Sequence, residues 1–253
     1  MKKILSSLLI ALLTIPAFSQ EKSEASPSKL NVLVFSKTAG FRHNSIANGI
    51  KILSELAQEN AWDLTSTENS QLITPGFLVN FDVVVFLNPT GDVFNQEQEK
   101  AFADFMKTGK GFVGIHASAD CEYDWAWYGG LNGAYFLMHP PAQEGTVIFE
   151  DCNHPSMEVF KGKDSWTTFD EWYSFKANPR AKVNVLARLD ESSIKKANND
   201  DWKMGDHPII WWQEYEGARS FYTGFGHTAE AFDDPNVKAH LAGAIEWAGK
   251  RKN

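Results

Sequence analysis

Cysteine is scarce in this chain, with 2 residues among 253, which excludes a small domain held together by several disulfides. Beyond the N-terminus no apolar run is long enough to cross a membrane, which excludes a polytopic membrane protein. Basic residues are in the minority, with 24 Lys and Arg against 32 Asp and Glu and a net charge of -8. No basic patch interleaved with aromatics occurs, so nucleic acid is not an expected partner.

The composition that is present is that of an ordinary globular protein, 43% hydrophobic and 22% charged. A single domain of this length buries roughly 70–75% of the surface of its unfolded chain, so a substantial core is expected. No internal repeat, low-complexity stretch or break in composition follows Lys29. We therefore predict one domain over residues 30–250.

The first residues have the pattern of a secretory signal peptide. Lys2 and Lys3 precede an apolar run over residues 4–18, and small residues, Ala17 and Ser19, stand at -3 and -1 of a cleavage site. The run is shorter than the ~20 residues that a membrane anchor needs. We predict a signal peptide over 1–19, a polar linker over 20–29, and export to the periplasm or cell exterior.

Two properties of the exported form follow from this prediction. Loss of the two lysines with the leader moves the net charge from -8 to -8 - 2 = -10. An oxidising compartment also permits a disulfide between Cys121 and Cys152. Their spacing leaves open whether they pair.

Strand and helix patterns alternate through the first half of the chain. Continuous β-rich runs lie at 30–36, 62–67, 82–87 and 111–115. A helical spacing of apolar residues covers 45–60, and a second helix begins after Asn95, with Gln98 completing a capping box, and stops at Gly109. This order predicts an α/β fold with a mostly parallel sheet and helices on both of its faces.

The second half is less regular and is expected to elaborate this core. Strands are predicted at 146–149, 183–189, 209–215 and 219–223, and a helix at 236–249. Glu216-Gly217-Ala218 separates the last two strands and predicts a hairpin.

Polar side chains follow three of the predicted parallel strands. Ligands bind beyond the carboxyl ends of such strands, so these side chains are candidate substrate contacts. They are Thr38, Arg42, His43, Asn88, Thr90 and Asp120. The alternative is that they are ordinary polar loop residues, although two histidines and an arginine in these loops favour a site.

His116 follows the fourth strand in Gly114-Ile115-His116-Ala117-Ser118, the position and shape of a nucleophile elbow. A histidine there is not the nucleophile of an ordinary acyl transfer. It can be a metal ligand, a general base or a polar contact to a ligand. Ser118 as a displaced nucleophile is a further alternative.

Other histidines lie far from His116 along the chain, and no pair has the close spacing of a metal-binding motif. His227 ends the last predicted strand and His139 precedes two prolines. A site made of His116, His139, His227 and a carboxylate would suit zinc. His240 is interpreted as a surface or packing residue of the last helix, and His154 as a turn residue.

Acidic and aromatic residues adjoin each other in Asp170-Glu171-Trp172-Tyr173. Aromatic faces beside polar groups suit a sugar, whose C–H faces stack on rings while its hydroxyls bond to acids. Trp172, Tyr173 and His207 are therefore candidate substrate contacts, and Glu171 or Asp206 is the candidate acid. The alternative is that the aromatic side chains only fill the core.

Five ordered segments resemble the ThuA-like (trehalose utilisation) family, over about Leu30 to Gly249. They are 37–43 (KTAGFRH), 114–117 (GIHA), 170–173 (DEWY), 205–208 (GDHP) and 222–227 (YTGFGH). The resemblance implies a flavodoxin-like fold similar to class I glutamine amidotransferases. His116 stands where those enzymes have a cysteine nucleophile, and Ala229 stands where a glutamate follows their catalytic histidine, which argues against glutamine hydrolysis.

The resemblance also implies a role in disaccharide catabolism, alongside enzymes that oxidise sugars to 3-keto derivatives. We therefore expect a hydrolase, lyase or isomerase that acts on trehalose, another disaccharide or a 3-keto-glycoside. His116 and His227 would serve as bases or ligands of a divalent metal such as zinc, with Glu171 or Asp206 as the acid. The alternatives are a non-catalytic saccharide-binding or accessory protein, and a scaffold for partners. The oligomeric state is not predicted.

Overall fold

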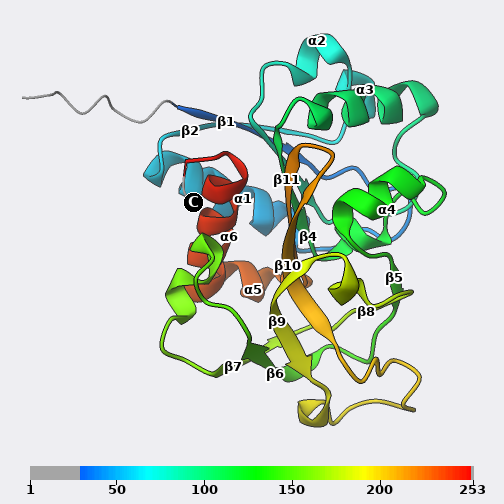
Figure 1. Ribbon diagram of the computed structural model, residues 1–253, viewed down its shortest axis with the longest axis vertical. Helices are drawn as coiled ribbons and strands as arrows, with labels where there is room; N and C mark the ends of the chain where they lie inside the picture. Colours follow the sequence, from blue (N-terminus) through cyan, green and yellow to red (C-terminus); the bar gives the residue numbers. More distant parts are fainter. Residues whose placement is uncertain (1–28, 252–253) are drawn as a thin grey trace, which may run out of the picture.

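A computed structural model describes residues 29–251, built around one nine-stranded sheet (Figure 1). The predicted signal peptide over 1–19 lies outside the described residues, as does all of the predicted linker except Lys29. The strands, in spatial order, are β2 (Trp62–Thr67), β1 (Leu30–Phe35), β3 (Val83–Leu87), β4 (Gly111–Ile115), β11 (Ala218–Thr223), β10 (Pro208–Tyr215), β9 (Asn184–Asp190), β6 (Gln143–Phe149) and β7 (Ser165–Asp170). The strands from β2 to β11 are parallel, and those from β10 to β7 are each antiparallel to their neighbours.

Helices cover both faces of the sheet, as the alternation of strands and helices predicted. One face carries α1 (Ile46–Glu59), α5 (Ala229–Asp233) and α6 (Pro235–Ala248), and the other carries α2 (Pro75–Leu78), α3 (Gln96–Lys107) and α4 (Ala126–Asn132) (Figure 1). Asn95 and Gln98 form the predicted capping box at the start of α3. The α/β fold is therefore confirmed.

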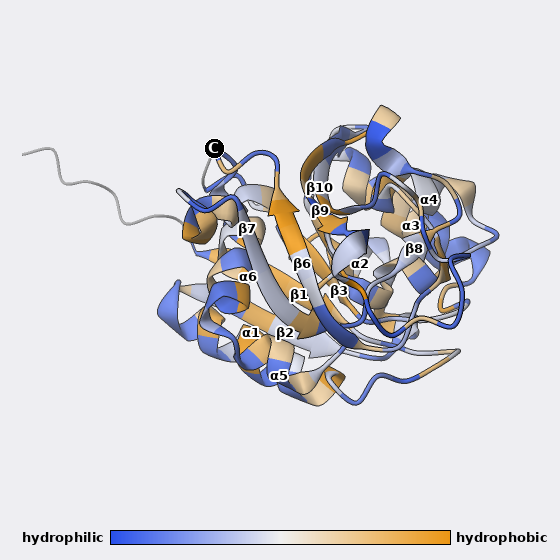
Figure 2. Ribbon diagram, turned by 90° about the horizontal axis from the view of Figure 1, so that it is seen from below, coloured by the Kyte–Doolittle hydropathy of each residue, from blue (hydrophilic) through white to orange (hydrophobic). Residues whose placement is uncertain are grey.

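Both faces of the parallel strands are buried because alternate side chains pack in opposite directions. In β1, Val32 and Val34 join the core under α1 and α6, whereas Leu33 and Phe35 join the core under α3. Figure 2 shows hydrophobic colour concentrated on the strands in the middle of the molecule and hydrophilic colour on much of the outer helices and loops. Continuous apolar runs therefore mark these strands in the sequence.

The antiparallel half is where the sequence predicted least. The hairpin of β10 and β11 is confirmed, but β7 and the small separate sheet of β5 (Phe136–Met138) and β8 (Ser174–Phe175) were not predicted. Residues of β7 are alternately exposed, and its sequence SWTTFD is polar, so it lacks the apolar run of a buried strand. Four successive antiparallel steps from β11 bring the carboxyl end of β7 to the edge where the parallel strands end.

Remaining predictions for single residues are resolved by the packing. Cys121 and Cys152 are both free thiols, so the permitted disulfide is not formed. His240 is fully buried in α6, where its ring nitrogens contact Ser156 O and Thr223 Oγ1. His154 is also buried and caps a 3₁₀ turn.

Within residues 29–251, no helix is long and apolar enough to span a bilayer.

His154 and His240 predict a loss of stability in mild acid. Burial lowers the pKa of His154 from 6.5 to about 3 and that of His240 from 6.5 to about 4. Below pH 6.5 the unfolded chain therefore binds protons that the folded chain excludes, so stability is complete above pH 6.5 and falls as the pH drops toward 4. We expect urea denaturation to show a free energy of unfolding roughly 2–4 kcal/mol lower at pH 5.0 than at pH 7.5.

The matched control for this prediction is His240→Asn, which removes one of the histidines that stay neutral in the folded chain. This variant should be less stable at pH 7.5 but should lose less stability between pH 7.5 and pH 5.0. An unfolding free energy equal at both pH values in the unaltered protein would contradict the prediction.

Candidate functional site

The loops that follow β1, β3 and β4 are joined to one another at the carboxyl edge of the sheet. Thr38 forms an isolated parallel bridge with Thr90, and Gly91 forms another with Cys121. Gly91 has a φ of 74°, and a Cβ at this position would lie 3.0 Å from Gly40 N, so only glycine allows the loops to approach this closely. The three loops are thus held in a fixed arrangement around the edge.

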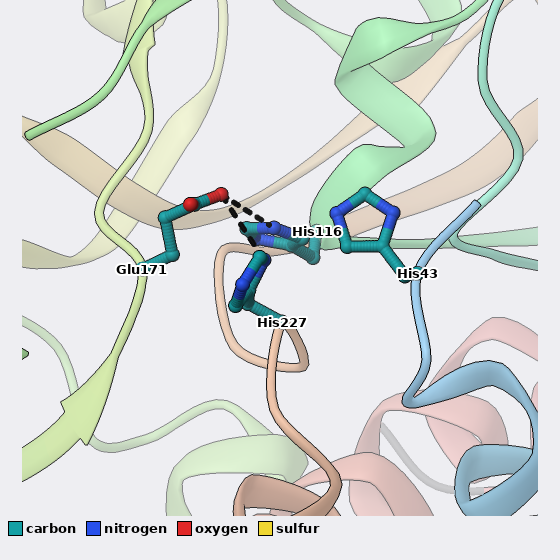
Figure 3. A group of neighbouring side chains, drawn as sticks. All are labelled: His43, His116, Glu171 and His227. Atoms are coloured by element: carbon teal, nitrogen blue, oxygen red, sulfur yellow. Dashed lines mark ion pairs between the residues drawn. The ribbon is translucent and has the colours of Figure 1, made fainter. Parts of the chain in front are cut away.

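Three histidines and a glutamate from separate loops meet at this edge (Figure 3). They are His43 after β1, His116 after β4, Glu171 after β7 and His227 after β11. One ligand atom from each lies within 4.8 Å of the others. We call these four residues the His-Glu cluster. His43, His116 and Glu171 are at least 94% buried, whereas the His227 side chain is 25% exposed and connects the cluster to solvent.

The backbone at His116 has the strained conformation of an elbow. Its φ is 42°, a region that non-glycine residues rarely occupy, and a 3₁₀ turn begins there. The ring Nδ1 lies 3.1 Å from Gly224 O. Because a carbonyl oxygen only accepts, Nδ1 must carry the proton, and Nε2 keeps its lone pair when the ring is neutral. Nε2 lies 3.5 Å from Glu171 Oε2, inside the cluster.

Several nitrogens of the cluster lack a hydrogen bond within the described part of the chain. His43 Nδ1, His116 Nε2 and His227 Nδ1 are all buried and have no partner of acceptable geometry, although His227 Nδ1 lies 3.1 Å from Glu171 Oε2. A buried polar atom without a partner costs roughly 1–3 kcal/mol. Two of these atoms, His116 Nε2 and His227 Nδ1, converge on Glu171 Oε2, which is a geometry that fits the ligands of a metal ion.

Asp170 holds two members of the cluster in place through their backbone. Its carboxylate accepts N–H bonds from Glu171 at 3.0 Å, Gly226 at 2.8 Å and His227 at 3.0 Å. Asp170 is almost fully buried, and burial raises its pKa, which attraction to His116 and the backbone bonds only partly offset. One side chain thus ties the loop after β7 to the loop after β11.

A second set of polar contacts fixes the loop that carries His227. Gly226 O accepts hydrogen bonds from Ser45 Oγ at 3.0 Å and from Asn88 Nδ2 at 2.9 Å. Gly226 has a φ of 116°, and a Cβ there would lie 2.9 Å from Ile115 Cγ2, so no other residue fits without rearrangement. The predicted contact residue Asn88 therefore supports the cluster from behind.

Burial and neighbouring charge set the protonation of the cluster. Burial, with repulsion from His116 and His227, lowers the pKa of His43 from 6.5 to about 3, so this ring is neutral at pH 7. Burial opposes ionisation of Glu171, but its contacts with His116 and His227 outweigh burial and hold its pKa well below the ordinary value. Burial likewise lowers the pKa of His227, but the contact with Glu171 outweighs it and raises the pKa overall. The cluster therefore combines an anionic carboxylate with a neutral imidazole, as a cation site requires.

The structure groups the predicted metal ligands differently at one position. His116 and His227 belong to the cluster, but His139 does not, and His43 takes its place. His139 Nδ1 lies 3.0 Å from Glu171 Oε1 and 2.9 Å from Pro140 O, so this nitrogen is directed at the carboxylate and a carbonyl. His139 is therefore placed beside the cluster, against the other oxygen of Glu171.

Three further candidates have partners outside the cluster. Asp206 forms an ion pair with Arg180 at 2.6 Å on the surface, so it is not placed as the catalytic acid. His207 is fully buried between Glu191 Oε1 at 2.8 Å and Tyr173 O at 2.9 Å, which leaves neither nitrogen for a ligand. Arg42 forms an exposed bidentate pair with Glu68.

The remaining candidates mostly support the site. Tyr173 packs its ring 4.0 Å from that of His116. Trp172 is buried and donates from Nε1 to Gln143 O, so it is a core residue. Thr90 Oγ1 donates to Phe41 O, which fixes a loop, and Asp120 accepts a 2.6 Å bond from Tyr123.

Two features of the site were missed in the sequence. His43 was predicted only as a substrate contact, although its place after a parallel strand was the same signal that singled out His116. Asp170 was noted only as a neighbour of Glu171. Its contacts with the backbone N–H groups of Gly226 and His227 join residues far apart in the sequence, so no sequence motif predicts them. Cys121, the cysteine next after the elbow, is wholly buried, and burial raises its pKa well above the ordinary value, so it is no nucleophile.

Comparison with solved structures shows the same fold. A ThuA-like protein from Bacteroides uniformis is 22% identical, with a TM-score of 0.73 over 90% of this chain and 95% of that chain. A ThuA-like protein from Parabacteroides merdae is 18% identical, with a TM-score of 0.70 over 88% of this chain and 91% of that chain. The glutaminase domain of CTPS from Trypanosoma brucei is 10% identical, with a TM-score of 0.52 over 89% of this chain and 95% of that chain.

At the level of sequence, no curated protein matches this chain. A family profile does match, with the description trehalose utilisation, and it covers residues 31–248 and therefore every residue of the His-Glu cluster. The chain belongs to the ThuA family.

Proposed function

We propose that the His-Glu cluster binds a divalent transition metal and that the loaded site acts on a saccharide. The observation behind the proposal is the convergence of three imidazoles and one carboxylate within 4.8 Å, where the buried His116 Nε2 and His227 Nδ1 lie 3.5 and 3.1 Å from Glu171 Oε2 without a hydrogen bond. Imidazole and carboxylate ligands suit zinc, which takes nitrogen at about 2.0–2.1 Å. Ligand atoms on one such ion lie about 3.4 Å apart, so the side chains need to close in by about 1 Å.

The saccharide part of the proposal is supported by the family description and by the polar, partly aromatic surroundings of the cluster. A bound divalent ion would polarise a substrate carbonyl or acidify a bound water. The 3-keto-glycosides are suitable substrates, because the C3 carbonyl acidifies the C–H bond at C2. His139 lies beside the cluster but outside its ligand set, and its Nδ1 is directed at Glu171 Oε1, so we assign its Nε2 as the base that takes that proton.

Proton removal at C2 leads to cleavage of the glycosidic bond. The electron pair of the C2–H bond forms a C1–C2 double bond, and the glycosidic oxygen leaves from C1 with a proton returned by the imidazole. Addition of water across the double bond then gives net hydrolysis, and omission of that step gives a lyase.

We also propose that the protein is exported, because of the leader-like pattern at residues 1–19.

The proposal is tested by metal analysis and by a proton-exchange assay. We expect the purified chain to bind about one equivalent of zinc. In deuterated water, 3-keto-trehalose should lose its H-2 signal in the NMR spectrum and release glucose, detected by mass spectrometry. EDTA should stop both reactions and added zinc should restore them. Trehalose, sucrose and cellobiose with their 3-keto forms complete the panel.

Each outcome of this assay decides one part of the proposal. Absence of metal binding would overturn the metal centre. Binding of a sugar without exchange or product over long incubation would replace the enzyme by a saccharide-binding protein. Metal binding with no sugar bound or converted would overturn the saccharide assignment.

A further inference from the structure

Phe41 is an exposed aromatic residue two positions before a buried member of the His-Glu cluster. Its exposed fraction is 65%, whereas that of His43 is 3%. The two rings nevertheless touch edge to face, with centroids 4.9 Å apart. Phe41 therefore lies at the solvent side of the cluster, directly against one of its imidazoles.

The loop that presents Phe41 is held on both sides. The N–H groups of Ala39 and Gly40 donate to Thr90 O at 2.7 and 3.2 Å, and Thr90 Oγ1 donates to Phe41 O at 2.7 Å. On the other side Arg42 forms its bidentate pair with Glu68. The backbone of Phe41 is thus fixed while its ring remains in water, which is the state of a preorganised contact surface.

Single exposed hydrophobic residues are common and need no explanation by themselves. Phe41 differs because it is fixed by its neighbours and adjoins the buried imidazole of His43, one of the three imidazoles of the cluster. A phenyl ring at such a mouth covers an apolar face of a ligand whose reacting end enters the cluster. Among the ligands of the proposed function, the matching face is that of a pyranose ring whose C–H bonds point to one side.

We propose that Phe41 is the sugar-stacking residue of this site and favours pyranosides with an unobstructed C–H face, such as gluco-configured rings. This inference rests on the proposed function. Phe41 would select among sugars, but it would neither bind the metal nor take part in proton transfer. An axial hydroxyl on the stacked face would hold the sugar away from the ring and weaken binding.

The test compares sugar binding by Phe41→Ala, Phe41→Trp and the unaltered zinc-loaded chain, measured by calorimetry with trehalose, cellobiose and their 3-keto forms. Phe41→Ala should weaken binding about tenfold, which corresponds to about 1.4 kcal/mol. Phe41→Trp should bind at least as well as the unaltered chain. Zinc content and thermal midpoint should stay unchanged in both variants.

Val79→Ala is the matched control, because Val79 is 68% exposed but lies just before β3, at the opposite edge of the sheet. It should leave sugar binding unchanged. If the unaltered chain binds sugar and Phe41→Ala binds equally well, the stacking role is overturned while the proposed function stands. If Phe41→Ala converts a dimer into a monomer on gel filtration, Phe41 is an interface residue and the inference is wrong. If no panel sugar binds the unaltered chain, both the saccharide assignment and the stacking role are overturned.

Discussion

Replacing His116 by alanine should lower the affinity of the chain for zinc by more than 100-fold and abolish turnover. Loss of a residue that only orients a metal ligand typically costs about 10–100-fold in affinity, so loss of a ligand should cost more. The Nε2 atom of His116 is buried, keeps its lone pair because Nδ1 bonds Gly224 O, and lies inside the cluster. Zinc affinity is measured by competition with a chromogenic chelator, and turnover by the exchange assay described above.

Two further variants separate loss of the metal from loss of the fold. His116→Asn removes the imidazole but retains a residue type that tolerates the positive φ of 42° at this elbow. It should lose zinc as His116→Ala does, with a smaller loss of stability. His240→Asn removes a histidine that is equally buried but lies outside the cluster, so it should lose stability and keep zinc. Normal zinc affinity in both His116 variants would refute the assignment of this residue.

Most of the parallel half of the fold could be predicted because its physical signals are local. A strand buried on both faces has to be apolar throughout, as in residues 83–87, and a capping box of Asn95 and Gln98 fixes the start of a helix within a residue. In β7 the signal is missing, because Thr167 and its neighbours alternate between solvent and core and short polar strands resemble loops. Pairing with β6 stabilises this strand, and pairing across the chain is not a local property.

The sequence predicted where the candidate site lies in the fold, but it did not predict every residue that belongs to it. The rule that ligands bind beyond the carboxyl ends of parallel strands brought His43, His116 and His227 to one edge, where the structure places them. Which histidine completes the cluster depends on side-chain direction after folding. His139 points at the outer oxygen of Glu171, and His207 is enclosed by Glu191 and Tyr173 O, yet nothing in their spacing differs from that of a ligand.

Replacing Asp170 by alanine should both destabilise the fold and weaken the metal site. The change would leave three N–H groups without an acceptor, the buried ones of Glu171 and Gly226 and the partly buried one of His227. At roughly 1–3 kcal/mol for each unsatisfied group, the free energy of unfolding should fall by about 3–9 kcal/mol. Zinc affinity should fall by about 10–100-fold, because two ligands lose the contact that orients them. Urea denaturation and chelator competition measure the two effects.

Graded substitution tests whether the two effects have one cause. In Asp170→Asn the amide oxygen can still accept from Glu171 and His227, but the amide nitrogen would face the N–H of Gly226, so both losses should be intermediate. Asp82→Ala is the matched control, because Asp82 also accepts a backbone N–H, that of Asn31, and pairs with Lys110 at the opposite edge of the sheet. It should lower stability and leave zinc affinity unchanged. Should Asp170→Ala bind zinc as tightly as the unaltered chain, Glu171 and His227 would be positioned by their own loops, and the role given to Asp170 would be wrong.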